Sequence, residues 1–384
     1  MKHMLKYSML ALTLFSVSCQ ENSTEKSSVK VTSVKHTAVK RQSIGNCWLY
    51  AQATWLESLL KDTNGEEVDV SETYWTYWDL YHKLLEKEPV PEEELNTGGS
   101  WGMSSEIIRR YGWVTEAEFI ESEAAESMSE AQSCAEDYIM AQGKENGTLH
   151  DVNLRTPEYV RAELDKAFSC DGKYTVNMDA ALEKARKASD TMLVDVKSGK
   201  QYSLSTMLNS WRQISGPGAY GSSEGKQLVS EAELLRYRNI EQRIKKALND
   251  HYPVVMSFYV TFNAPDQNGV FNLKTLAEKG QLGDGGGHMV VLHDYTVDKV
   301  PTEDGGFTSL AEGDLDPELK EKALLGEMNF LVAKNSWGAN RRDRPWLRDG
   351  YSRFTWDYLQ NRYWDEDSEI YRSFFRSVVL PPGY

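Results

Sequence analysis

The fold can be inferred from the stretch Gly45-Asn46-Cys47-Trp48-Leu49-Tyr50-Ala51, because it places a cysteine at the start of a predicted amphipathic helix. From Cys47 to Lys61 the apolar side chains recur every three or four residues, which is helical spacing. A helix N-terminus presents unpaired N–H groups and a positive dipole end, and both favour a thiolate. Gly45 permits a close approach of the backbone. Cys47 is therefore a candidate nucleophile, although a buried, inert cysteine would fit this one feature as well.

A cysteine nucleophile needs a base, and His288 has the local setting of one. It follows the glycine-rich run 283–287 and opens the apolar run Met289–Leu292, which predicts a strand. The glycine-rich run is no phosphate loop, because a strand rather than a helix follows it. His293 competes for the role, but strand side chains alternate, so we expect the two histidines to face opposite sides. The flexible loop favours His288, although a lone histidine at a strand end is often structural.

An orienting group for the base follows the predicted strand Phe330–Lys334, in the segment Asn335-Ser336-Trp337-Gly338. An asparagine oxygen can accept a hydrogen bond from one imidazole nitrogen and hold the ring in place. Trp337 would shield that bond from water, and a plain core tryptophan is the alternative.

Three short motifs in the order Cys, His, Asn resemble the papain family of cysteine peptidases: Gly45-Asn46-Cys47-Trp48, Gly287-His288-Met289-Val290 and Asn335-Ser336-Trp337-Gly338. Gly350-Tyr351 is similar to the closing segment of that family. The resemblance implies an α+β protein of two lobes. A helical left lobe carries Cys47, a β-rich right lobe carries His288 and Asn335, and the active-site cleft lies between the lobes.

The bleomycin-hydrolase branch is the nearer resemblance within that family. Ile44 stands where most papain relatives carry a disulfide cysteine, which that branch also lacks. Other similar residues are Ser71, Tyr74, Trp78, Asp79, Gly98-Gly99-Ser100-Trp101 and Tyr111-Gly112. By this resemblance Gly98 and Gly99 bind the substrate backbone, and a plain turn is the alternative. The resemblance covers residues 40–120 and 250–360 and is poor between them.

The glutamine that stabilises the oxyanion in the papain family has no direct counterpart. The family places it six positions before the cysteine, where Arg41 stands, and Gln42 is one position late. A loop shortened by one residue would bring Gln42 into place. Otherwise the backbone N–H of Cys47 would hold the oxyanion with another donor.

The N-terminal segment predicts export. Lys2 and Lys6 form a basic region, and the apolar run Met9–Val17 is too short to span a bilayer as a helix. Small residues before Cys19 resemble a bacterial lipoprotein cleavage site. We therefore expect a signal peptide at 1–18, lipid attachment at Cys19 and a place in the bacterial cell envelope, in the outer membrane or secreted. Ordinary signal-peptide cleavage nearby is the alternative.

The rest of the chain divides by its pattern of elements. We predict a tether and N-terminal arm at 19–40, a helical left lobe at 41–120, a helical insertion at 121–250 and a β-rich right lobe at 251–384. Helices are predicted at Cys47–Lys61, Ser71–Lys87, Ser104–Arg110 and Glu231–Leu248, with a helix start at Thr156-Pro157. Strands are predicted at Pro253–Val260, Met289–Leu292, Phe330–Ala333 and Ser373–Val379. The acidic stretch 298–327 is predicted to be a loop. The segment between Cys19 and Cys47 is too short for an inhibitory pro-domain.

The net charge limits the class of binding partner, and the cysteine content predicts a disulfide. The 384-residue chain has a net charge of −15, which disfavours nucleic acid as a partner. Without Cys19 an odd number of cysteines remains, which in an exported protein predicts one disulfide and one free thiol. Cys134 and Cys170 have no catalytic setting, so we expect these two to be paired.

The sequence thus predicts a cysteine peptidase that cleaves peptide or protein substrates through a thiolate–imidazolium pair and a thioester, with no metal or organic cofactor. We expect an endopeptidase, because few residues remain beyond the predicted strand Ser373–Val379 to reach the cleft. An aminopeptidase of the bleomycin-hydrolase type is the alternative. Transglutaminase-like amine transfer and an inactive envelope-binding protein of the same fold are further alternatives.

Overall fold

The computed structural model describes residues 34, 37–65, 67–216, 230–310, 313, 316–347, 349–365 and 370–384. The predicted signal peptide at 1–18 and the predicted lipid-attachment residue Cys19 lie outside the described residues, as does most of the tether. None of the described helices is long and apolar enough to cross a membrane.

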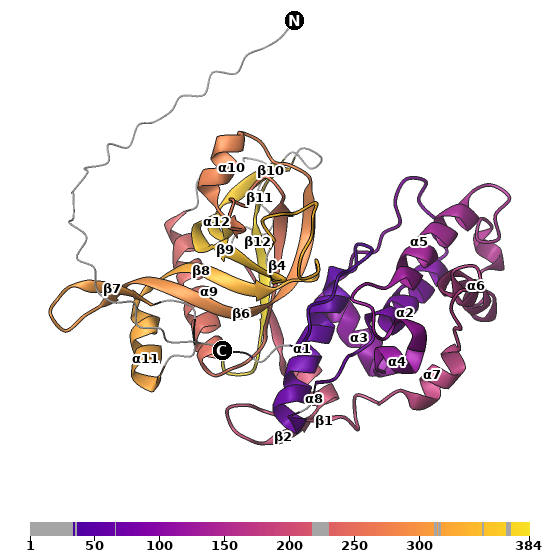
Figure 1. The fold of residues 1–384 in the computed structure, drawn as a ribbon, viewed down its shortest axis with the longest axis horizontal. Coiled ribbons are helices and arrows are strands. Elements are labelled where there is room, and N and C mark those ends of the chain that lie inside the picture. Colours follow the sequence, from indigo (N-terminus) through magenta and orange to yellow (C-terminus); the bar gives the residue numbers. More distant parts are fainter. Residues whose placement is uncertain are drawn as a thin grey trace, which may run out of the picture.

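One lobe is built of helices and occupies the indigo-to-magenta half of the molecule (Figure 1). Its α-helices are α1 (Cys47–Asn64), α2 (Glu72–Leu85), α3 (Trp101–Tyr111), α4 (Glu116–Phe119), α5 (Glu130–Gly143), α6 (Pro157–Ser169), α7 (Met178–Lys184) and α8 (Leu204–Ser210). Two short 3-10 helices at Glu121–Glu123 and Val152–Leu154 and a hairpin of β1 (Met192–Val194) and β2 (Gln201–Ser203) complete it.

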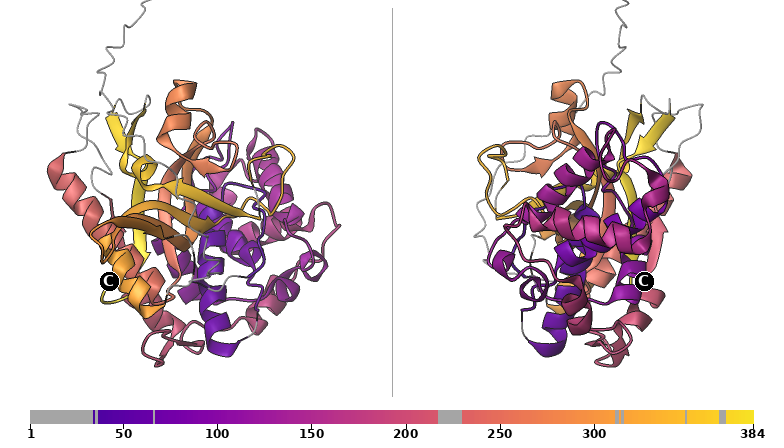
Figure 2. Two further views of the ribbon diagram at one scale, coloured as in Figure 1. Left: turned by 60° about the vertical axis from the view of Figure 1, so that its left-hand side comes forward. Right: turned by 90° about the vertical axis from the view of Figure 1, so that its right-hand side faces the viewer.

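The other lobe is built on an eight-stranded sheet with the order β3-β12-β4-β6-β8-β9-β5, in which β7 pairs with β6. Most of its strands are the orange and yellow arrows of Figure 2. The strands are β3 (Arg212–Ser215), β4 (Val254–Thr261), β5 (Val270–Phe271), β6 (Gly285–Pro301), β7 (Phe307–Leu310), β8 (Glu327–Lys334), β9 (Tyr351–Thr355) and β12 (Phe375–Leu380). A separate hairpin joins β10 (Arg362–Asp365) and β11 (Ile370–Ser373). The helices of this lobe are α9 (Glu231–Asn249), α10 (Leu273–Lys279), α11 (Pro317–Leu325) and α12 (Trp356–Gln360).

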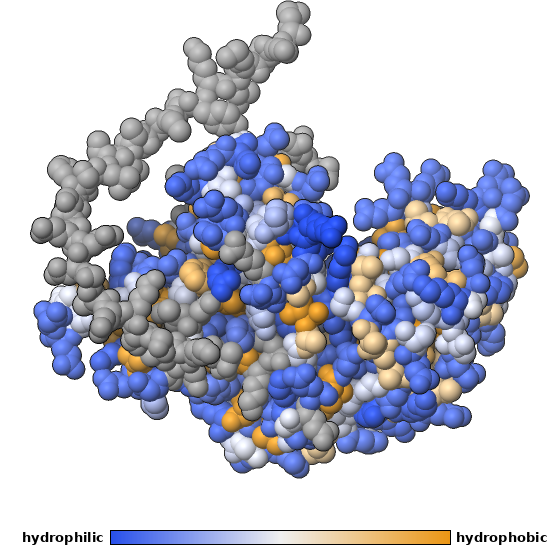
Figure 3. Space-filling model, viewed as in Figure 1, coloured by the Kyte–Doolittle hydropathy of each residue, from blue (hydrophilic) through white to orange (hydrophobic). Residues whose placement is uncertain are grey.

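The α+β class and the two-lobed arrangement predicted from the sequence are confirmed. On the visible face a notch separates the upper parts of the two lobes (Figure 3). The predicted helices and strands are present, with ends shifted by a few residues at most places.

Helix α1 lies at the boundary between the lobes. Every residue from Cys47 to Leu60 is buried, including polar ones such as Gln52, Glu57 and Ser58. A helix that is buried all round must have neighbours on all sides. It packs against α2 and α3 in its own lobe and against β4 and β6 of the sheet. Gly65 ends it in the left-handed conformation, with its N–H bonded to the carbonyl of Lys61 at 2.8 Å.

Strand β6 is much longer than the predicted Met289–Leu292. It begins at Gly285, inside the glycine run that we expected to be a loop, and continues to Pro301. A Cβ atom on Gly285 would lie 2.1 Å from the carbonyl oxygen of Val260, so the close pairing of β4 and β6 requires glycine there.

The acidic stretch 298–327 also differs from its prediction as a loop. It contains the end of β6, the strand β7 and the helix α11. Strand β7 is largely exposed, and Ala323 is the buried residue of α11. Elements with so little buried surface carry a polar sequence, and this explains why their hydrophobic pattern was too weak to detect.

The first strand of the large sheet lies before residue 251, where the β-rich lobe was predicted to begin. Strand β3 pairs with β12, and α9 packs on β4, β6 and β12. The segment 121–250, which the sequence predicted as one helical insertion, therefore contributes α5 to α8 to the helical lobe and β3 and α9 to the β lobe.

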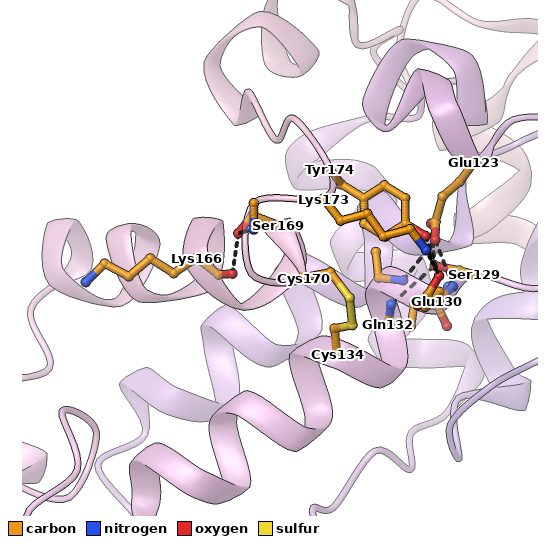
Figure 4. The surroundings of a disulfide bond; sticks show 12 residues. Glu123, Ser129, Glu130, Gln132, Cys134, Lys166, Ser169, Cys170, Lys173 and Tyr174 are labelled. Atoms are coloured by element: carbon orange, nitrogen blue, oxygen red, sulfur yellow. Dashed lines mark hydrogen bonds and ion pairs between the residues drawn. A yellow bond between two sulfur atoms is a disulfide. The ribbon is translucent and has the colours of Figure 1, made fainter.

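A disulfide joins Cys134 in α5 to Cys170 at the C-terminal cap of α6 (Figure 4). Their Cα atoms are 5.3 Å apart. Beside the bond, Glu130 accepts a hydrogen bond from Tyr174 at 2.7 Å and pairs with Lys173. The predicted pairing is confirmed, and Cys47 is the free cysteine among the described residues.

Candidate active site

The fold brings the three motif residues to one place at the boundary of the lobes. Cys47 is the first residue of α1, His288 lies near the start of β6, and Asn335 directly follows β8. Helix α1 packs on β6, and β6 pairs with β8, so the three segments are neighbours. All three side chains are buried, with 8%, 5% and 3% of their surfaces exposed.

His288 and Asn335 share a hydrogen bond whose direction can be assigned. The bond joins His288 Nε2 to Asn335 Oδ1 at 2.8 Å. The same oxygen accepts from the backbone N–H of Ser336 at 2.8 Å, and Asn335 Nδ2 donates to Ser352 Oγ at 3.0 Å. These two contacts fix the amide so that its oxygen faces the ring, and Nε2 therefore carries the proton. The second ring nitrogen, Nδ1, is then free to act as a base.

Aromatic side chains hold the His288 ring. Trp337 stacks on it, with ring centroids 4.7 Å apart and planes at 22°, and Phe258 meets it edge-on at 5.8 Å. Trp337 is itself buried. The predicted shielding of the His288–Asn335 bond by Trp337 fits this geometry.

His293, the competing candidate, has a different neighbour. Its ring lies 5.1 Å from that of Tyr351, while the contact with Asn335 belongs to His288. The β6–β8 pairing shifts in register between Leu292 and Asp294, at the position of His293.

Burial works against charge on both members of the proposed pair. Desolvation raises the pKa of the Cys47 thiol to about 11, although the N–H groups of Met289, Trp48 and Cys47 oppose that rise. Desolvation lowers the pKa of His288 to about 4, and the nearby Arg344 cation lowers it further, while the bond to Asn335 acts in the opposite direction. Each shift favours a neutral thiol beside a neutral imidazole at pH 7, rather than a preformed ion pair.

Gln42 lies on the loop that leads into Cys47 and is tied to the Asn335 segment. Its backbone N–H donates to the carbonyl of Ser336 at 2.9 Å, and its Oε1 accepts from Ser336 Oγ at 2.6 Å. Its Nε2 donates to the carbonyl of Ile44 at 2.8 Å, which uses one of its two protons. The second proton is available for an oxyanion, and that role stays a prediction.

The Gly98-Gly99 segment lies against the tryptophan next to the nucleophile. Trp48 Nε1 donates to the carbonyl of Thr97 at 2.9 Å, and a Cβ atom on Gly99 would lie 2.3 Å from the Trp48 ring. Lys83 donates to the carbonyl of Gly98 at 2.9 Å. Gly99 is exposed, and within the described part of the chain its N–H and C=O have no hydrogen-bond partner. Of the two glycines, Gly99 is thus the one whose backbone is free to pair with an extended peptide.

Two supporting residues were missed in the sequence. Asn46, which precedes the nucleophile, is buried and donates from Nδ2 to Thr76 and to Gln132, each at 2.8 Å. Gln132 lies in α5, so the middle of the chain supports the start of α1. Ser352, the partner of Asn335, directly follows the Gly350-Tyr351 motif, and this position was the available signal.

A buried ion cluster lies behind the site and connects the lobes. Lys334, which precedes Asn335, donates to Thr37 at 2.8 Å and lies 3.9 Å from Glu57 of α1. Lys40 pairs with Glu72 at 2.7 Å and lies 3.5 Å from Glu57. Glu57 thereby links the N-terminal arm, α1 and β8.

Comparisons with known proteins gave no match to a protein-family model or to a curated protein. Among solved structures, the chain is similar to PepW of Lactobacillus rhamnosis, with 14% identity and a TM-score of 0.46 over 94% of this chain and 82% of that one. It is also similar to the bromelain protease of Ananas comosus, with 14% identity and a TM-score of 0.35 over 90% of this chain and 93% of that one. SERA5E of Plasmodium falciparum gives 14% identity and a TM-score of 0.38 over 90% and 88%. Likenesses this distant assign no activity, which must be inferred from the site itself.

Proposed function

We propose that this chain is a cysteine peptidase with Cys47 as nucleophile, His288 as base and Asn335 as the residue that orients the base. The observation that carries the proposal is the fixed Asn335 amide, which accepts from His288 Nε2 at 2.8 Å and leaves Nδ1 as the basic nitrogen. The free thiol of Cys47 lies at a helix N-terminus, against the N–H of the residue that follows His288.

The proposed reaction is acyl transfer in two steps. His288 Nδ1 takes the thiol proton as the sulfur of Cys47 attacks the peptide carbonyl, since burial disfavours separate charges beforehand. The N–H of Cys47 and the Gln42 amide stabilise the oxyanion. The intermediate collapses to a thioester as protonated His288 gives its proton to the leaving amine. Water, deprotonated by His288, then releases the acyl group and restores the thiol. No step requires a metal or an organic cofactor.

The path of the C-terminal strand supports an endopeptidase rather than an aminopeptidase. Phe375 of β12 lies opposite Phe258, which in turn pairs with His288, whereas Val379 lies opposite Val255. Strand β12 therefore runs away from His288.

The residues after β12 are held at the far end of the sheet. Tyr384 donates through its hydroxyl to Asp250 and accepts there from Lys197 at 3.0 Å, and Arg243 donates to its backbone oxygen. Its ring packs on Tyr252 at 5.4 Å. Tyr252 is six residues before Phe258, about 20 Å along an extended strand. Residues 381–384 thus lie at the end of the sheet away from His288.

We propose that the protein is an envelope lipoprotein attached through Cys19, on the sequence pattern at 1–19. Cells fed labelled palmitate should incorporate it into the wild-type protein and lose that incorporation in Cys19→Ser.

Covalent labelling tests the activity. An epoxysuccinyl peptide that alkylates cysteine peptidases should modify Cys47, and peptide mapping should locate it there. Cys47→Ala and His288→Ala should abolish peptide hydrolysis, with kcat falling at least a thousandfold. The matched variant His293→Ala should keep most activity. A protein that binds peptides but shows neither labelling nor turnover would be an inactive member of this fold.

A further inference from the structure

A cationic side chain lies near the proposed base, and no ion pair within the described residues joins it to a carboxylate. The guanidinium of Arg344 lies over the rings of Phe262, 4.1 Å from its centroid, and Trp337, at 4.7 Å. Its Nη1 is buried and makes no hydrogen bond within the described residues. Trp337 in turn stacks on His288. The ring of Trp337 thus lies between Arg344 and the proposed base His288.

The charged groups nearest Arg344 do not neutralise it. Arg341 and Asp343 are its neighbours in sequence, but they form a two-pronged pair with each other, with Arg341 Nε 2.9 Å from Asp343 Oδ1. Arg41 is the other nearby charge and is also a cation. The backbone of Arg41 pairs with Trp337, and its side chain lies beside Gly338. Two arginines thus border Trp337 in a chain with a net charge of −15.

Arg344 keeps its charge under physiological conditions. Burial lowers its pKa to about 10, Arg341 and Arg41 lower it further and the Asp343 carboxylate opposes that fall, and Arg344 is still protonated at pH 7. A half-buried guanidinium that forms no ion pair within the described residues has lost hydration, and the attraction of Asp343 does not replace it in full. A ligand carboxylate would therefore gain both hydrogen bonds and charge neutralisation there.

The chemistry of the proposed reaction indicates which part of a substrate passes this point. His288 gives its proton to the leaving amine, so the residue that begins with that amine must lie against His288. Trp337 packs on His288 and Arg344 lies over Trp337, so chain that continues from that residue on this side of His288 comes to Arg344.

We infer that Arg344, with Arg41 beside it, binds a carboxylate on the leaving segment of the substrate. The inference rests on the proposed peptidase function and adds a substrate class to it. The preferred substrates carry either an Asp or Glu side chain or a free C-terminal carboxylate within the first residues after the scissile bond.

Acyl transfer to added amines measures this directly. A mixed set of N-acetylated peptide methyl esters would acylate Cys47, and an added amine would then compete with water for the thioester. Aspartate amide against asparagine amide tests a side-chain carboxylate, and alanine against alanine amide tests a terminal one. The readout is the ratio of amide to acid product, determined by mass spectrometry. Differences in basicity between the amines cancel when the same ratio is compared between enzymes.

The carboxylate preference is the ratio of amide to acid product with the carboxylate-bearing amine, divided by the same ratio with its neutral counterpart. We expect this preference to fall about tenfold from wild type to Arg344→Gln for at least one of the two amine pairs. The pair that responds identifies the carboxylate as a side chain or a chain terminus. Arg344→Lys should retain part of the preference because it keeps the charge. The control variant Arg342→Gln, which changes an exposed arginine of the same loop and leaves the Arg341–Asp343 pair intact, should stay within twofold of wild type. Equal ratios in wild type and Arg344→Gln in both arms would overturn the inference, while the ester hydrolysis in the same samples would still support the peptidase. Absence of any ester turnover in wild type would overturn the proposed function and this inference with it.

Discussion

Ser352 accepts a hydrogen bond from the side-chain amide of Asn335 at 3.0 Å, and this contact turns the amide oxygen, rather than its nitrogen, toward His288. With Nδ2 held by Ser352 and Oδ1 facing both His288 and the N–H of Ser336, the amide cannot rotate without losing three hydrogen bonds. The tautomer of the base is therefore set by a residue that takes no part in the chemistry.

Ser352→Ala should weaken catalysis without changing substrate binding. We expect kcat to fall about threefold to tenfold and KM to stay constant, since one hydrogen bond that orients the base is worth roughly 1 kcal/mol. Asn335→Ala should cost more than Ser352→Ala and less than His288→Ala. Ser377→Ala is the control, because Ser377 is also buried in the sheet but bonds to Gln213. A loss in Ser377→Ala equal to that in Ser352→Ala would indicate a general effect on the sheet.

The pH dependence of thiol alkylation should distinguish a neutral pair from an ion pair. With the Cys47 pKa raised to about 11, the thiolate is a small minority at pH 7 and increases as pH rises. The rate of alkylation of Cys47 by iodoacetamide should therefore climb steadily from pH 6 to pH 10. A preformed thiolate–imidazolium pair would instead give a plateau through neutral pH, which starts where the thiol loses its proton at low pH and ends where the imidazolium loses its own. Observation of that plateau would contradict the neutral resting state.

The sequence was informative where chemistry depends on adjacent residues and less so where it depends on packing. Cys47, His288 and Asn335 each lie in a short motif with a recognisable local structure, and the fold class followed from them. Glu57 and Arg344 carry no local signal, because their roles arise from contacts with segments far away in the chain. The polar elements at 298–327 were missed for a related reason, since they bury too little apolar surface to show a period.

Removal of the disulfide should destabilise the helical lobe without removing the site. The double variant Cys134→Ser, Cys170→Ser opens a bridge across a sequence separation of 36 residues. In the chain-entropy model this should lower the free energy of unfolding by about 3–4 kcal/mol, measured by urea denaturation. Peptide hydrolysis at low denaturant should remain. Intact mass after alkylation without reductant checks the bond itself, and three modified thiols, Cys19 not counted, would contradict it.

Glu57 should be a stability determinant at the boundary between the lobes. Glu57→Gln removes the charge that faces the buried Lys334 and Lys40. A buried cation that loses its partner typically costs about 3 kcal/mol or more of unfolding free energy, and urea denaturation would measure it. Glu67→Gln is the matched control, because Glu67 pairs with Lys61 at the surface and its loss should cost less than about 1 kcal/mol. Equal costs in both variants would argue against a special role for the cluster.

The position of the C-terminal residues predicts cleavage within peptides. Because β12 runs away from His288 and Tyr384 is held by Asp250 and Lys197, an N-acetylated peptide should enter the site as readily as a free one. We expect the two forms of one peptide to be cut at the same internal bonds, with kcat/KM values within about threefold. A variant that lacks residues 381–384 should cut at the same bonds, since these residues lie at the far end of the sheet from His288. Sequential release of single residues from the free peptide, with the acetylated form left intact, would show instead that the enzyme is an aminopeptidase.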